Sequence, residues 1–145
     1  MTAAHNAANS GIAFRGVHPA TGKVYAYMET LGGGFGARAS KDGLDGVQVH
    51  IANTSNLPIE ALESTYPLLV RRYALVTDSG GPGRSRGGMG FIRQIEVLGG
   101  QATAQPQVAR VVVPPWGLFG GQPGGRLAGR GPAGRSALEG ARAWR

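Results

Sequence analysis

Glycine is the residue that most constrains this chain, because 26 of its 145 positions are glycine and nine more are proline. Many of these residues gather in clusters: GGGFG at Gly32–Gly36, KDGLDG at Lys41–Gly46 and DSGGPGRSRGG at Asp78–Gly88. Glycine destabilises the interior of a helix or strand, so such clusters belong between elements. The sequence therefore predicts short elements joined by long Gly-rich loops, and long loops in stable proteins tend to carry function.

The segments between the clusters have the composition of β-strands. Apolar residues alternate with others in KVYAYME, Lys23–Glu29, and in VQVHIA, Val47–Ala52. The two longest candidates, Leu68–Thr77 and Met89–Leu98, predict an antiparallel hairpin with a long Gly-rich tip. A last candidate strand, Val108–Val113, is stopped by two prolines.

One short helix is predicted over Leu57–Thr65. Pro58 suits a first helical turn, and Glu60 and Glu63 place negative charge near the positive end of the helix dipole. Together these patterns predict a β-rich α+β fold of short antiparallel strands with long Gly-rich loops and one short helix. The apolar content is thin for the chain length, so we expect an incomplete fragment of a larger domain.

The net charge of +7 is concentrated at the C-terminal end of the chain. Residues 124–145 hold five arginines, one glutamate and few large apolar side chains. We therefore expect an Arg/Gly/Ala-rich, disordered tail beyond residues 1–123, with a short helix over Ser136–Trp144 as the alternative. An arginine-rich contact with nucleic acid is a further alternative, which the small charge of residues 1–123 disfavours.

Several classes of protein are excluded or disfavoured by what the sequence lacks. It has no cysteine, which excludes disulfides and zinc–thiolate sites, and no apolar run long enough to span a membrane. The first ten residues do not have the pattern of a signal peptide, so we expect a cytoplasmic protein. The glycine clusters match neither the Walker loop nor the dinucleotide fingerprint, and the histidines lack metal-ligand spacing.

Two groups of polar residues are candidates for binding. His50 ends a predicted strand just before the polar turn Asn53–Asn56, a common place for binding residues, although a partly buried structural histidine is the alternative. Arg84 and Arg86 lie in the Gly-rich tip and are suited to hold a carboxylate or phosphate, with a solvated loop as the alternative.

Three long stretches of the chain resemble the hydantoinase B/oxoprolinase family. They are GGGFGARASKDGLDGVQVHIANTSNLPIEALE at Gly32–Glu63, YPLLVRRYALVTDSGGPGRSRGGMGFIRQIEVL at Tyr66–Leu98 and PPWGLFGGQPG at Pro114–Gly124. Together they cover most of residues 11–124. The resemblance implies a B-type subunit of an N-methylhydantoinase or the C-terminal half of a 5-oxoprolinase, enzymes that couple ATP hydrolysis to the opening of a cyclic amide.

The resemblance also implies partners, cofactors and site residues. An A-type subunit or domain activates the cyclic-amide substrate by phosphorylation, and the complete enzyme uses ATP and a divalent metal. The family motifs that would hold the metal do not occur here, so we expect a C-terminal fragment that binds no cofactor and is inactive alone. Residues that match the family by position, as candidates for the substrate site or an interface, are His50, Asn53, Thr54, Asn56, Arg84 and Arg93, together with Glu63.

Structural roles are the alternative for individual members of this set, namely helix capping for Asn56 and loop bracing for Arg84. For the function of the whole chain, there are two alternatives to the cyclic-amide hydrolase. One is a non-catalytic module that docks on an A-type subunit. The other is a subunit of a related ketone carboxylase.

Overall fold

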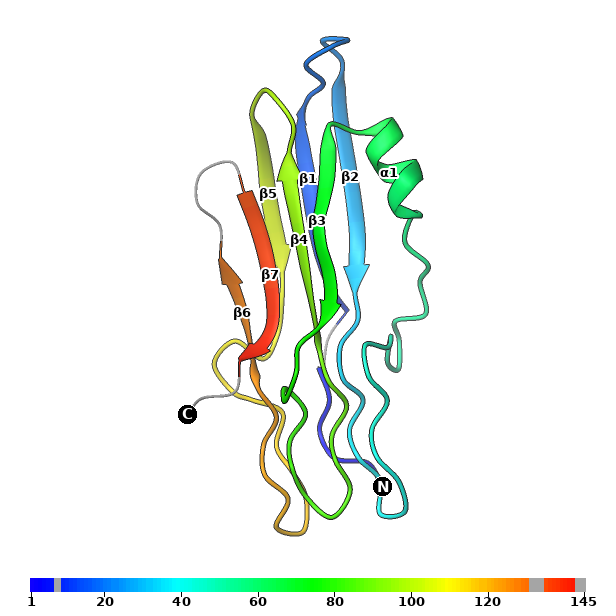
Figure 1. Ribbon diagram of the computed structural model, residues 1–145, viewed down its shortest axis with the longest axis vertical. Coiled ribbons are helices and arrows are strands. Elements are labelled where there is room, and N and C mark those ends of the chain that lie inside the picture. The colour runs from blue at the N-terminus through cyan, green and yellow to red at the C-terminus, as the bar shows by residue number, and fades with distance from the viewer. Residues whose placement is uncertain (7–8, 131–134, 143–145) are drawn as a thin grey trace.

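The protein is a two-sheet structure of antiparallel strands with one short helix, seen in a computed structural model that describes residues 1–6, 9–130 and 135–142 (Figure 1). One sheet has the strand order β2-β1-β5 and the other has the order β3-β4-β7-β6. The elements are β1 (Ser10–Val17), β2 (Val24–Leu31), α1 (Ile59–Thr65), β3 (Leu68–Leu75), β4 (Phe91–Val97), β5 (Ala102–Gln107), β6 (Arg126–Arg130) and β7 (Arg135–Arg142). The β-rich α+β class predicted from the sequence is confirmed.

The two sheets face each other, and the core lies between them. In β2 the side chains alternate in burial, so that Tyr25, Tyr27 and Leu31 point inward while Val24 and Met28 are exposed. Residues of β1, β3, β4 and α1 complete the core: Ile12, Phe14, Leu62, Leu68, Phe91 and Ile95.

Helix α1 lies where the chain passes from one sheet to the other (Figure 1). Its Leu62 side chain is completely buried in the core, which fixes the orientation of the helix. The Glu63 carboxylate accepts a hydrogen bond of 2.8 Å from the backbone N–H of Val70, so it ties the helix to β3. The predicted capping role of Asn56 is wrong, because the helix has Pro58 at its N-cap and no side-chain cap bond.

The predicted hairpin and helix are confirmed, since β3 and β4 pair antiparallel and α1 falls within the expected range. Two predicted strands are wrong. In Val47–Ala52 only Val47 pairs, through an isolated bridge, and the chain bends at His50, whose φ is 52°. In Val108–Val113 the last three valines are exposed and belong to no strand.

Two strands of the first sheet were not predicted. β1 showed only a short apolar cluster in the sequence, but Ile12 and Phe14 both point into the core. β5 consists mostly of small and polar residues and includes Pro106, so it carries no strand pattern. Proline is tolerated there because β5 is an edge strand that pairs with β1 alone.

The C-terminal residues differ from the expectation of a disordered tail. The backbone of β6 and β7 pairs antiparallel, and β7 pairs with β4. Part of the predicted tail, residues 131–134 and 143–145, lies outside the described residues. Main-chain hydrogen bonds account for the difference, because the open edge of β4 pairs with a strand largely irrespective of its side chains.

A buried ion pair joins the two sheets. Glu29 of β2 accepts hydrogen bonds of 3.0 and 2.9 Å from Nε and Nη2 of Arg93 on β4. The Tyr27 hydroxyl donates a further bond of 2.8 Å to the same carboxylate. The side chains of Glu29 and Arg93 are 0% and 4% exposed, so both charges are removed from water and depend on each other. Burial first, and then the Glu29 carboxylate, raise the pKa of Tyr27.

Removing one member of this pair should destabilise the fold strongly. We expect Arg93→Met to lower the free energy of unfolding by about 3–5 kcal/mol, because it leaves the Glu29 charge buried without a partner. The control is Arg71→Gln, which breaks the exposed pair with Glu96 and should cost less than about 1 kcal/mol. Urea denaturation measures both, and equal losses would contradict the importance given to the buried pair.

Candidate functional site

The Gly-rich segments lie together beyond one end of the sheets as extended loops (Figure 1). Backbone hydrogen bonds connect segments that are distant in the sequence. The Phe35 N–H donates to the Leu44 carbonyl at 2.9 Å, and the Gly88 N–H donates to the Phe35 carbonyl at 2.9 Å. The Gly43 N–H donates to the Arg86 carbonyl at 2.7 Å. The first bond closes the loop at 32–46 on itself, and the other two link it to the loop at 78–90.

Glycine is required at several of these crossings because the backbones touch. A Cβ on Gly34 would lie 1.9 Å from the Gly88 carbonyl oxygen, and a Cβ on Gly88 would lie 1.9 Å from the Leu44 carbonyl oxygen. A Cβ on Gly43 would meet the Phe35 carbonyl oxygen at the same distance. The Gly-rich clusters that separate the short elements in the sequence are therefore tightly packed. In them, the main chain of one segment contacts the main chain of another.

One ion-pair cluster braces the loops from the side. Asp45 accepts hydrogen bonds from Nη1 of Arg86 at 2.8 Å and from the backbone N–H of Met89 at 2.6 Å. Asp42 accepts a 2.6 Å bond from the backbone N–H of Arg86. The bond from Arg86, supported by the one from Met89, holds the pKa of Asp45 below its usual value. The bracing role predicted for Arg84 therefore belongs to Arg86.

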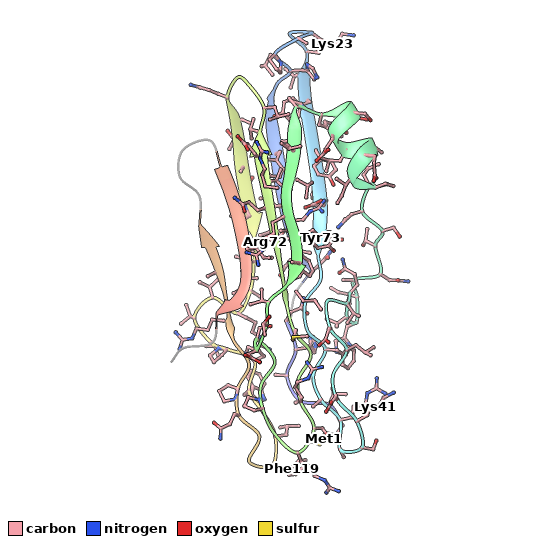
Figure 2. The ribbon with its side chains drawn as sticks, in the orientation of Figure 1. Met1, Lys23, Lys41, Arg72, Tyr73 and Phe119 are labelled. Atoms are coloured by element: carbon pink, nitrogen blue, oxygen red, sulfur yellow. The ribbon has the colours of Figure 1, made fainter. Side chains whose placement is uncertain are left out.

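A cavity of about 580 Å³ opens among these loops. Its walls come mainly from the N-terminal segment, the loop at 32–39, the loop at 79–90, residues 109–110 and the loop at 115–125. Met1 and Phe119 are both at this end of the molecule, away from Lys23 at the opposite end (Figure 2). The volume is in the range of small-molecule sites.

One wall of the cavity is built from stacked rings and arginines, and we call it the ring–arginine wall: Arg38, Phe35, His5, Arg110 and Trp116. The Arg38 guanidinium lies 5.5 Å from the Phe35 ring centroid, and the His5 ring stacks on Phe35 at 6.1 Å. Arg110 donates through Nε to the His5 carbonyl oxygen at 3.2 Å and lies 4.7 Å from the Trp116 ring centroid. Each arginine is thus held in place by a ring.

The structure does not bring the predicted site residues together. His50 is exposed, but its ring lies 4.4 Å from that of His5, so it adjoins the ring–arginine wall. Arg84 lines the cavity, whereas Arg93 is in the core. Asn56 binds the end of β2, through the N–H of Thr30 at 3.1 Å and its carbonyl oxygen at 2.6 Å.

The remaining predicted site residues, Asn53 and Thr54, are exposed in the turn before the helix. The residues of the ring–arginine wall, His5, Phe35, Arg38, Arg110 and Trp116, were not among the predicted site residues, and neither was Phe119. Trp116 and Phe119 carried a signal, since both lie in PPWGLFGG, where aromatic residues and turn residues are unusually combined, and Phe35 lies in the glycine cluster GGGFG.

The described residues also bear on metals and membranes. Among residues 1–6, 9–130 and 135–142, no three histidine, aspartate or glutamate side chains are grouped to hold a metal ion. The same part of the chain includes no helix long and apolar enough to cross a membrane.

Comparison with known proteins gives consistent matches. The family model described as hydantoinase B/oxoprolinase matches residues 1–140. The chain is 42% identical over 101 residues to a putative B-type subunit of a Pseudomonas D-/L-hydantoinase, covering 69% of this chain and 17% of that protein. It is 40% identical over 110 residues to 5-oxoprolinase 1 of Arabidopsis thaliana, covering 72% of this chain and 8% of that protein.

A solved structure shares the fold. The nucleotide-free structure of an acetone carboxylase superimposes with a TM-score of 0.71 at 24% identity, covering 86% of this chain and 17% of that chain. The chain therefore spans less than a fifth of the length of each of these proteins.

The close backbone contacts predict how Gly→Ala substitutions affect the stability of the protein. We expect Gly88→Ala to lower the free energy of unfolding by about 3 kcal/mol, the upper end of the range for overpacking, because the Leu44 carbonyl occupies the space of a Cβ. The control is Gly83→Ala, whose Cβ would meet its nearest atom at 3.3 Å and should cost about 0.5 kcal/mol or less. Urea titration of both variants decides the matter, and a mild effect at Gly88 would contradict the packing.

The surroundings of His5 in the ring–arginine wall predict that the stability of the protein depends on pH. Burial lowers the pKa of His5 below 6.5, and repulsion from His50 and Arg110 lowers it further, while the Asn6 side chain opposes the shift. The folded state thus favours the neutral form of His5. This preference contributes to the free energy of unfolding above pH 6.5, and the contribution is lost as the pH falls through the pKa of His5 in the folded state.

We therefore expect the urea midpoint of the parent protein to fall between about pH 7.5 and about pH 5.5 by more than that of His5→Phe, which keeps a ring but cannot be protonated. The control is His18→Gln, in the turn at the opposite end, where His18 Nδ1 accepts a hydrogen bond from the Ala20 N–H. An unchanged pH dependence in His5→Phe would refute the assignment to His5.

Proposed function

The chain belongs to the hydantoinase B/oxoprolinase family, and on that premise we propose that it forms one section of the B-type component of an ATP-dependent cyclic-amide hydrolase. The observation that carries the proposal is the family match over residues 1–140, together with identities of 42% and 40% to a B-type hydantoinase component and a 5-oxoprolinase. The reaction class proposed is hydrolytic ring opening of a 5-oxoproline-type or hydantoin-type substrate.

We further propose that this section acts only together with other polypeptide. The relatives are far longer than the matched region, and one of them is named as a subunit. The proposed partner is an A-type subunit, which would phosphorylate the amide oxygen of the substrate. The proposed contribution of this chain is to position one side of the site through its packed Gly-rich loops and the cavity between them. The cytoplasm is the compartment proposed.

A related ketone carboxylase subunit is the second candidate. It is favoured by the similarity in fold to an acetone carboxylase. A shared fold at 24% identity is compatible with both candidates and does not separate them. The relatives at 42% and 40% identity, in contrast, are named as a hydantoinase subunit and a 5-oxoprolinase. The hydrolase is therefore the proposal, and the carboxylase is an outcome that the experiment distinguishes.

A segment exchange tests the proposal. Residues 32–124 of this chain would replace the matching segment of the Pseudomonas B-type hydantoinase component, and the chimera would be combined with its A-type subunit. We expect ATP-dependent hydrolysis of hydantoin or 5-oxoproline by the chimera and none by the 145-residue chain with the A-type subunit. The control is the same chimera with Gly88→Ala, which should lose turnover because the loops no longer pack.

Other outcomes would redirect the proposal. A folded chimera that binds the A-type subunit without turnover favours a non-catalytic docking module. A chimera that consumes acetone and bicarbonate with ATP, and does not hydrolyse cyclic amides, favours the carboxylase. Turnover by the 145-residue chain without any partner would contradict the need for one.

A further inference from the structure

The cavity among the Gly-rich loops has an unbalanced charge. Three arginines line it, Arg38, Arg84 and Arg110, and the described residues of its lining include no aspartate or glutamate. The nearby carboxylates of Asp42 and Asp45 are engaged by Arg86. Cations gathered without counter-charges in a concave surface raise the local concentration of anions. The cavity is therefore electropositive.

Two of these arginines are already positioned. Arg110 rests on the Trp116 ring and donates to the His5 carbonyl through Nε, so the terminal amino groups of its guanidinium remain as donors. Arg38 lies over the Phe35 ring, with its Cζ 5.5 Å from the ring centroid. A guanidinium held in place by a ring loses less side-chain entropy on binding an anion than a free one.

The third arginine differs from these two. Arg84 is exposed at the tip of its loop and lines the cavity. Within the described part of the chain, its side chain makes no hydrogen bond or ion pair. Its charge is thus available to a ligand, and a substitution there removes charge without removing packing.

Aromatic rings also line the cavity. Trp116 is 53% exposed and Phe119 is 92% exposed, and the half-buried Phe35 belongs to the same lining. Phe119 has a φ of 50°, an unusual conformation for a large side chain, and persists only where the surrounding turn imposes it. The faces of these three rings can stack against a planar or cyclic group of a ligand.

We propose that this cavity binds a small organic anion, consisting of a carboxylate or phosphate attached to a planar or cyclic apolar body. Arg110 is the anchor, because guanidinium groups bind carboxylate and phosphate oxygens in bidentate fashion, and Arg84 contributes charge at the opening. The rings of Trp116 and Phe119 accommodate the apolar body. This proposal concerns the 145-residue chain and does not depend on the proposed function.

Fluorescence of Trp116 tests the proposal directly. The sequence has two tryptophans, so the variant Trp144→Phe leaves Trp116 as the only one. In this background, titration with benzoate and with phenyl phosphate should change the emission of Trp116 to saturation. Benzamide, a neutral molecule of the same shape as benzoate, should bind at least about tenfold more weakly, since it lacks the charge-assisted hydrogen bonds. The tighter of the two anions identifies the preferred head group.

Arginine variants in the same background test the site. Arg110→Gln and Arg84→Gln should each weaken binding of the tighter anion, by about tenfold for Arg110. The control is Arg72→Gln, on the exposed surface of β3 away from the loop end, which should leave binding unchanged (Figure 2). Circular dichroism checks the fold of each variant, and Arg84→Gln carries the test if Arg110→Gln does not fold.

Three results would overturn the proposal. They are no saturable response to either anion, benzamide binding as tightly as benzoate, and equal weakening by Arg72→Gln and the cavity variants. Because binding is measured on this chain alone, its failure is separate from a failure of the chimera to turn over cyclic amides.

Discussion

The buried pair of Glu29 and Arg93 is the interaction on which the arrangement of the two sheets depends. Each charge is taken out of water, and neither is tolerable there without the other. The pair joins residues 64 positions apart in the chain and therefore fixes how β2 faces β4. Tyr27 completes the set by donating to the same carboxylate, so the polar centre is satisfied while apolar residues surround it.

Away from the sheets, the molecule is held by a different kind of contact. Side chains fill the space between the sheets, whereas the Gly-rich loops beyond them pack through their main chains. Carbonyl oxygens such as that of Gly88 occupy positions where any Cβ would clash. This packing brings separate loop segments together around a cavity, and the ring–arginine wall lines it with side chains that come from distant parts of the chain. The position of the cavity is thus determined by backbone contacts.

Local pattern was sufficient for some of the fold. The β3–β4 hairpin and α1 could be predicted because their signals, alternation and N-terminal helix residues, lie within the elements themselves. Val47–Ala52 has an equally clear alternation, but no strand lies beside it beyond one bridge at Val47. β5 forms without such a signal, because the main chain of β1 offers it a partner. Strand formation at these places depends on neighbours that the sequence does not reveal.

The same distinction holds for the site. Residues close together in the chain were sufficient to predict the resemblance to the family, the β-rich class and the β3–β4 hairpin. Which charges meet depends on how distant segments pack. The tertiary structure buries Arg93 with Glu29, pairs Arg86 with Asp45, and places Arg110 beside His5, 105 positions away. The reason is physical: an arginine's role depends on its burial and on the carboxylates within reach, and both follow from how distant segments pack.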